Sequence, residues 1–299
     1  MASATAGIQQ THGPRDRLKA IRSDPLQDIG LPSKGDNRLL DFKTQEKYYG
    51  NIEERYAKLN SLSDSAEGIH TAFASLSLNG HEKTEPDDHG GRNKQRYAKP
   101  LEDSKELSII LDAMRKVREG IVASHRVDDF ARQVYMFVIR TTILLKHMPS
   151  YHPALLYLLH SIHPVNPLVI TERDEIVGYC ILDLACRQND LALAYEVRYR
   201  YKHCNPVVGL TLRALVHGDW ITFWKLKASM NVYQQRLMDS ADNRIKNIAL
   251  KALEKSYLKI QVTFLECAVK CSWDELTEQD KLSWMLQGQT MVKRRTQSK

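Results

Sequence analysis

The sequence predicts an all-α protein: stacked helical hairpins in a TPR-like array, followed by a small C-terminal winged helix with a β-hairpin. Three observations support this fold class. Beyond Leu101, apolar residues recur at intervals of three and four, which is the period of an amphipathic helix. Two turn sequences, LACRQNDLALAY and RALVHGDWITFW, correspond at an offset of 29 residues. Apolar and polar residues alternate around Gly288, as they do in a β-hairpin.

Composition divides the chain into five segments. Residues 1–36 are polar and without periodicity, which predicts a disordered tail. Residues 37–60 have a short helical pattern with an aromatic face, and residues 61–100, rich in Ser, Gly, Asp and Asn, indicate a disordered linker. A structureless stretch of that length favours a boundary. We therefore expect the helical-hairpin array at 101–240 and the winged helix with a basic tail at 241–299.

The repeated turns explain how the array is expected to form. Asn189-Asp190 and Gly218-Asp219 would each end one helix and cap the next. A hairpin cannot bury its apolar face alone, so neighbouring hairpins would share a continuous core. Thr171 and Asp174 have the spacing of a capping box. The expected helices lie near 107–117, 127–145, 152–164, 171–188, 191–201, 207–217 and 220–229, with a long one from about 231.

The end of the chain predicts the winged helix. DNRIKNIALKALEKSYLKIQVTFLE, from Asp242 to Glu266, begins as a long amphipathic helix. After Tyr257 the period changes, and VTFLECAV and WDELTEQDK indicate two short helices before the hairpin. Three helices and a hairpin in this order are typical of a winged helix. The long helix would bury its apolar stripe against both the array and the terminal segment.

Overall composition limits the class of protein. The 299 residues are 42% hydrophobic and 26% charged, enough for one sizeable core, and the net charge of +7 is mild for a nucleic-acid binder. Five unevenly spaced cysteines and a polar N-terminal start indicate a reducing compartment, the nucleus and/or the cytoplasm. The longest apolar run, 135–145, is interrupted by Arg140 and too short for a bilayer, so we expect no membrane contact.

No sequence motif points to catalysis. The chain lacks G-x-S-x-G, a Walker loop, G-x-G-x-x-G and H-E-x-x-H, so we expect no enzyme, no cofactor and no small-molecule substrate. Several histidines and two cysteines at helical spacing are candidate zinc ligands, but nothing in the pattern makes them converge. We expect helix-end, surface and core roles instead, and no metal. These residues are His147, His152, His160, His163, Cys267 and Cys271.

Two further groups of residues each allow two interpretations. An aromatic cluster is either core between hairpins or a platform for stacking bases; its members are Trp220, Phe223, Trp224 and Tyr233. A basic set is either a solvated face or, if the hairpin folds back, a patch for RNA phosphates. Its members are Arg244, Lys251, Lys255, Lys293, Arg294 and Arg295, with Lys299 beyond them.

Residues of the array's end and the terminal segment resemble a known superfamily. The stretch from Arg213 to Glu266, which begins with RALVHGDWITFW, is similar to the end of PCI-type domains. The resemblance covers roughly residues 101 to 295. It lies nearest the branch of the small signalosome subunit, a proteasome-lid subunit and the k subunit of translation initiation factor 3, and GANP-type mRNA-export proteins are equally near. The matching residues are Ala214, Gly218, Asp219, Trp220, Phe223, Trp224, Met238, Asp239, the helix 244–257, Val262, Phe264 and Leu265.

The resemblance implies a non-catalytic scaffold that assembles with other PCI-type subunits through its winged helix. On this hypothesis, Trp284 and Val292 of the hairpin are the partner-binding residues, because a two-stranded wing has an exposed edge and little core. The alternative is a GANP-like nuclear mRNA processing or export adaptor that binds RNA through the basic winged helix. GANP-type domains usually have NYxxFF after the turn, whereas this chain has DWITFW at 219–224.

Overall fold

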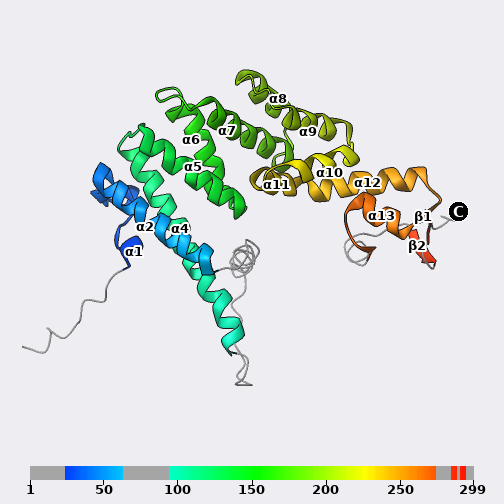
Figure 1. Cartoon of the computed structure of the whole chain (residues 1–299), viewed down its shortest axis with the longest axis horizontal. Helices are drawn as coiled ribbons and strands as arrows, with labels where there is room; N and C mark the ends of the chain where they lie inside the picture. Colours follow the sequence, from blue (N-terminus) through cyan, green and yellow to red (C-terminus); the bar gives the residue numbers. More distant parts are fainter. Residues whose placement is uncertain (1–23, 63–93, 274–283, 288–289, 294–299) are drawn as a thin grey trace, which may run out of the picture. The chain divides into compact units, whose positions relative to one another are not determined.

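The computed structural model describes residues 24–62, 94–273, 284–287 and 290–293 (Figure 1). The described part of the chain is mostly helical, so the predicted all-α class is confirmed. The chain divides into two compact units, residues 1–125 and 126–299. The boundary between them lies inside the region predicted as a single array.

Two long helices that pack against each other form the first unit. They are α2 (Phe42–Leu62) and α4 (Lys94–Ala123). Three short elements precede them: α1 (Pro25–Asp28), η2 (Pro32–Lys34) and η3 (Asn37–Leu40). Both long helices bury an apolar stripe, whose members are Tyr48, Tyr49, Ile52, Leu107, Ile110, Met114 and Val117.

The predicted disordered tail, 1–36, is wrong for residues 24–36. Leu26 is only 2% exposed, and its carbonyl accepts a hydrogen bond of 2.8 Å from the Tyr48 hydroxyl. The Asp36 carboxylate accepts a 2.6 Å hydrogen bond from the backbone N–H of Gly30. Local composition could not reveal the first of these bonds, because its two partners are far apart in sequence. Residues 1–23 lie outside the described part.

The predicted linker, 61–100, also needs correction at both ends. α2 extends to Leu62, and α4 begins at Lys94, before the expected start of helix at Leu101. Residues 101–125 pack on α2 in the first unit and do not belong to the array, because the α4 stripe finds its apolar partner there. α4 also approaches η3 closely at Gly120, where a Cβ atom would lie 2.8 Å from the Leu39 carbonyl oxygen. Residues 63–93 lie outside the described part.

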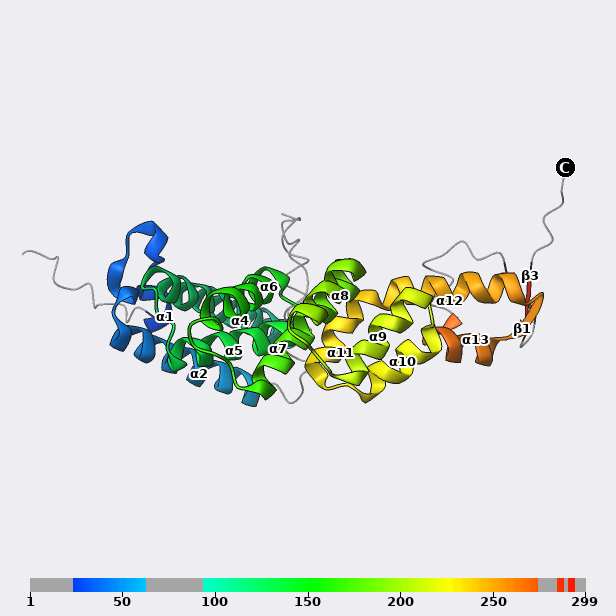
Figure 2. The same ribbon diagram turned by 90° about the horizontal axis from the view of Figure 1, so that it is seen from above.

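In the second unit, helices adjacent in sequence pack together (Figures 1 and 2). The pairs are α5 (Asp129–Leu144) with α6 (Met148–Tyr157), α7 (Ile170–Leu182) with α8 (Leu191–Arg200), and α9 (Pro206–His217) with α10 (Trp220–Ser229). α11 (Val232–Met238) packs on α5 and α7. Two π-helical turns, η4 (Leu158–Ile162) and η5 (Asp183–Arg187), continue α6 and α7.

The two repeated turns have the same backbone design. Asn189 and Gly218 occupy the left-handed region, with φ angles of 57° and 65°. The aspartate after each caps the next helix: Asp190 accepts from the N–H of Leu193 at 2.9 Å, and Asp219 from that of Thr222 at 3.0 Å. The predicted turns and caps are therefore confirmed. The predicted capping box at Thr171 is wrong, because α7 begins at Ile170 with Val169 as its N-cap.

The long helix expected from about residue 231 is broken. α11 ends at Met238, a 3₁₀ turn η6 (Asp239–Ala241) follows, and α12 (Asp242–Ser256) begins in a new direction (Figure 1). α11 starts with a capping box formed by Asn231 and Gln234, which fixes its entry. The break coincides with two partly buried acidic side chains, Asp239 and Asp242, that bind lysines of the array.

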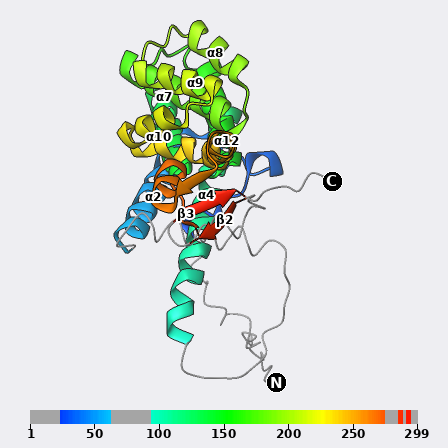
Figure 3. The ribbon, with the colours of Figure 1, turned by 90° about the vertical axis from the view of Figure 1, so that its right-hand side faces the viewer.

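A small sheet and one short helix follow α12. β1 (Lys259–Gln261) was not predicted, whereas α13 (Val262–Val269) matches the expected segment VTFLECAV. β2 (Trp284–Gln287) and β3 (Thr290–Lys293) are antiparallel, which confirms the predicted hairpin (Figure 3). β3 also pairs with β1, so the strand order is β1-β3-β2. The helix expected at WDELTEQDK lies outside the described residues, apart from Trp273.

Gly218 connects the second turn to α12. Its φ of 65° favours glycine, and an added Cβ would meet the Ile248 Cγ2 of α12 at 3.2 Å. We predict that Gly218→Ala lowers the free energy of unfolding by roughly 1–3 kcal/mol, because left-handed strain and crowding add. The measurement is a denaturant titration followed by circular dichroism.

Gly50 provides the matched control. It lies within α2, and an added Cβ meets no atom within 4 Å. Gly50→Ala should raise stability by about 0.5–1 kcal/mol, because glycine is costly inside a helix. Equal effects of the two substitutions would show that the turn at Gly218 does not constrain α12.

Candidate functional site

The α9–α10 turn and α12 together position a half-buried tryptophan. Asp219 caps α10, so Trp220 is the first residue of that helix and lies where α10 meets α12. Trp220 packs against the core of the terminal segment. The buried members of that core are Ala249, Leu250, Leu253, Ile260, Leu265, Val269 and Cys271. One indole thus joins the array to the terminal segment.

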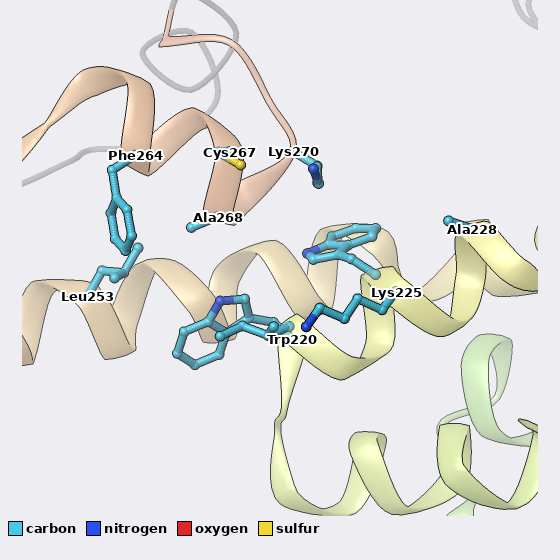
Figure 4. A pocket seen from close by; sticks show the side chains of 10 residues that line it. Trp220, Lys225, Ala228, Leu253, Phe264, Cys267, Ala268 and Lys270 are labelled. Atoms are coloured by element: carbon cyan, nitrogen blue, oxygen red, sulfur yellow. The ribbon is translucent and has the colours of Figure 1, made fainter.

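A hollow of about 430 Å³ opens beside this tryptophan between α10, α12 and α13. We call it the tryptophan groove. Figure 4 shows Phe264, Cys267 and Ala268 of α13 on one side, with Trp220 and Leu253 opposite them. Its volume lies within the range of roughly 300–1,000 Å³ that is usual for ligand sites. It is lined by Trp220, Ile221, Trp224, Lys225, Ala228, Leu253, Phe264, Cys267, Ala268 and Lys270.

Two polar atoms at the groove lack partners. The indole Nε1 atoms of Trp220 and Trp224 are shielded from solvent, and neither has a hydrogen-bond acceptor among the described residues. A buried N–H without an acceptor costs roughly 1–3 kcal/mol. The two tryptophans therefore carry a binding capacity that the described part of the chain leaves unused.

Ion pairs hold α10, which carries Trp220 and Trp224, to the start of α12. The Lys227 ammonium of α10 lies 2.6 Å from Asp239 and 2.7 Å from Asp242. Lys146, in the turn after α5, also reaches Asp239 at 2.7 Å. Burial acts to raise the pKa of Asp239, but hydrogen bonds from Lys146 and Lys227 outweigh it and hold that pKa below its usual value. For Asp242, burial dominates and the pKa is raised.

The predicted partner-binding residues fall on opposite faces of the sheet. The register pairs Trp284 with Lys293 and Met285 with Val292, and directly opposed residues share a face. β1 identifies the faces: Lys259, opposite Val292, is exposed, whereas the next residue, Ile260, is buried in the terminal core. Val292 is therefore placed on the outer face, and Trp284 on the face directed toward the core.

Of the six residues of the predicted basic patch, four are described, and one of them makes a contact within the fold. Arg244 donates a 2.9 Å hydrogen bond to the Ala185 carbonyl, so it serves the contact of α12 with the array. Lys251 and Lys255 are exposed on α12. Lys293 is the last described residue of β3, opposite Trp284. Arg294 and Arg295 lie outside the described residues.

The aromatic cluster combines core and surface roles. Phe223 is fully buried and its ring meets Trp224 edge-on at 5.2 Å, and Tyr233 contacts the buried Tyr179. These contacts agree with the core interpretation. Sequence reasoning missed that Trp220 and Trp224 also line a groove, because helical spacing cannot separate a fully buried ring from one with an open side.

Of the four histidines considered as metal ligands, three have other contacts, and His160 is exposed. His147 Nδ1 is 2.8 Å from the Ser150 hydroxyl, and His163 Nδ1 accepts from the N–H of Leu168 at 3.0 Å. His152 lies 3.2 Å from the buried Asp183. In the ranges that the structure describes, no three His, Cys, Asp or Glu side chains converge as metal ligands would. Cys271 belongs to the terminal core, whereas Cys267 is exposed at the groove.

A second hollow, of about 440 Å³, lies at the end of α8. Its lining mixes basic and aromatic side chains: Tyr195, Arg198, Tyr199, Lys202, His203 and Cys204. Tyr199 is 89% exposed. Sequence analysis did not single this stretch out, although the alternation in YEVRYRYKH could have indicated a surface for nucleic acid.

Comparisons with known proteins add no family to this geometry. No protein-family model and no curated protein sequence matches the chain. Among its described helices, none combines the length and the apolar character that crossing a membrane requires.

The ion pairs of Lys227 give a test of how the groove is held. Lys227→Met should lower the free energy of unfolding at neutral pH by about 1.5–3 kcal/mol, because two carboxylates lose a charged partner. The loss should shrink as the pH falls below about 4, through the lowered folded pKa of Asp239, because protonated carboxyls need no counter-charge. The sign follows for Asp239, since a lowered folded pKa gives stability above the unfolded pKa that is lost on acidification.

The measurement is thermal unfolding across this pH range. Lys251→Met, at an exposed position of α12, is the control and should have little effect. Lys227 also lowers the pKa of Asp242 against the effect of burial, so its loss raises the pKa of both carboxyls, and for each of them the deficit shrinks on acidification. A deficit that stays constant with pH would show that Lys227 acts through packing alone.

Proposed function

We propose that this chain is a non-catalytic interaction subunit of a PCI-type multi-protein complex, of the proteasome-lid, signalosome or initiation-factor class. It would act in the nucleus and/or the cytoplasm. One observation carries the proposal: large apolar side chains are uncovered on α13 and α10 at the tryptophan groove and in the segment between α12 and β1. Phe264 is 51% exposed, Ile221 54% and Leu258 79%. Gathered apolar exposure of this kind is typical of an interaction surface.

The order of elements supports the finer architecture that we propose. α12, β1, α13 and the β2–β3 hairpin, with β3 between β1 and β2, follow the order of a winged helix. The consecutive helix pairs and the two equivalent turns support a TPR-like array before it. β2 and β1 are the edges of the sheet, and a partner strand or helix could cover them.

The sheet register indicates which of the two predicted residues, Trp284 or Val292, should contact a partner. Val292 shares a face with the exposed Lys259, so it is the position for a contact with another subunit. Trp284 shares a face with the buried Ile260 and is expected to support the fold. The two residues, predicted together as partner-binding, thus take different roles in the proposal.

Gel filtration of cell extract tests the assembly. The endogenous protein should elute well above the 34.3 kDa of one chain, and RNase treatment should leave this unchanged. Val292→Asp should return the protein to the monomer position with an unchanged melting temperature. Val216→Asp, at a 51% exposed valine of α9, is the matched control and should remain assembled. Elution of the wild-type protein as a lone monomer would contradict the proposal.

RNA binding is the second candidate function, as a GANP-like processing or export adaptor. The observation that favours it is the exposed Tyr199 among Arg198, Arg200 and Lys202 at the end of α8. Aromatic side chains beside cations suit single-stranded nucleic acid, because bases stack while phosphates pair. The exposed Lys251 and Lys255 of α12 offer the other location.

Fluorescence anisotropy with a single-stranded oligouridine probe separates these locations. If α8 is the site, Tyr199→Ala should weaken binding by roughly the 1–3 kcal/mol expected of one stacked base. If α12 is the site, Lys251→Glu with Lys255→Glu should lower the salt slope by roughly one unit for each lost phosphate contact. Absence of binding in low salt would exclude both.

A further inference from the structure

The tryptophan groove has a defined chemical character. Its walls are apolar side chains of α10, α12 and α13, while Lys225 and Lys270 stand at its rim. Neither lysine forms an ion pair with any described residue, and no carboxylate lines the hollow among the described residues. Any occupant therefore meets an apolar interior under a positive rim.

The indole donors add a second requirement. Trp220 Nε1 and Trp224 Nε1 are buried without acceptors among the described residues, one turn apart on α10. Because both atoms are shielded from solvent, an occupant reaches them only by displacing the side chains that cover them, and it must then supply two separate acceptors. A fatty acyl chain has acceptors only at its head, whereas an extended peptide has a carbonyl at every residue. Water could satisfy one donor but would not use the apolar walls.

The backbone at the rim is also set by the fold. α13 ends at Val269, and its C-cap residue, Lys270, adopts a left-handed φ of 57°. A non-glycine residue in this conformation carries strain. The cap N–H bonds back to Glu266, so the turn that carries Lys270 is fixed beside the groove.

From these observations we propose that the tryptophan groove binds an acidic peptide segment of a partner protein, with a large apolar side chain inserted and carboxylates beside Lys225 and Lys270. This rests on the proposed function as an interaction subunit and names the chemistry of the partner. Backbone carbonyls of the segment accept from the two indole N–H groups. The apolar anchor fills the hollow, which supplies most of the affinity, while the carboxylates provide orientation and rate.

The direct test is a titration of the full-length, ¹⁵N-labelled protein with the peptide Ac-Glu-Asp-Leu-Phe-Glu-Asp-amide. The chain has 4 tryptophans, and each gives one indole N–H resonance in the spectrum. Two of the four, assigned to Trp220 and Trp224 by substitution to phenylalanine, should shift downfield as their N–H groups gain acceptors. The others should remain in place.

Peptide controls separate the components of the proposal. The same peptide with serines in place of its Leu and Phe should not bind. A peptide with lysines in place of its acidic residues should bind roughly threefold to tenfold more weakly for each of the two rim lysines. Lys225→Glu with Lys270→Glu should reverse that preference. Laurate is the lipid control. Stronger shifts with laurate or with the basic peptide would overturn the proposal.

A variant in which a large side chain fills the groove tests whether the peptide binds there. Ala228 is exposed at the groove, so Ala228→Trp should abolish the shifts while leaving the fold intact. Ala192→Trp, at an exposed alanine of α8, should bind the peptide as the native protein does. If Ala228→Trp instead abolishes self-association seen in sedimentation, the occupant is a second copy and the proposal is wrong.

The outcome is independent of the assembly test. Assembly that depends on Val292, together with unshifted indoles, would keep the proposed function and reject the acidic peptide. Indole shifts in a protein that remains monomeric in extract would keep the peptide site and reject membership of a PCI-type complex.

Discussion

α12 is the helix on which the rest of the second unit depends, because it belongs to two cores. Toward the array, its Ile248 lies beside Gly218 and its Arg244 reaches the Ala185 carbonyl. Toward the chain end, Ala249 and Leu253 are buried with β1 and α13. An amphipathic helix gains most of its stability from the apolar surface that it packs on. α12 needs both partners, so the groove between them rests on a rigid base.

The same arrangement explains why the groove is available for binding. Trp220 is held by the Asp219 cap and by the terminal core, and Lys227 ties α10 to the acidic residues at the start of α12. Side chains held in this way lose little conformational entropy when a partner binds, which favours affinity. The unpartnered indole donors are then a cost of the free state that a partner can remove.

Sequence reasoning located the features that depend on neighbouring residues. The turn pairs at Asn189 and Gly218, the stripe of α12 and the alternation around Gly288 are local signals, and each led to the observed element. The ordered structure of residues 24–36 was not predicted, because it depends on a hydrogen bond from Tyr48 to the Leu26 carbonyl. Local composition cannot indicate such a partner. The α4 stripe was assigned to the array because periodicity does not say which surface a helix packs on.

The candidate site was harder to predict than the fold. The break at η6 depends on how Asp239 and Asp242 meet Lys227 in three dimensions. Trp284 and Val292 were grouped by apolar character, and only the strand register separates their faces. Trp220 and Trp224 have the spacing of core residues, and the groove arises because α13 crosses near them, while their indole N–H groups are shielded from solvent without an acceptor among the described residues.

Native-state hydrogen exchange of α12 tests most directly whether this helix is shared by two cores. If it is, amides of residues 246–253 should exchange as slowly as those of α9 and should lose protection together with α13 in rising denaturant. Exchange of α12 and α13 that is much faster than that of α9 would contradict this, since the terminal segment would then open without the array.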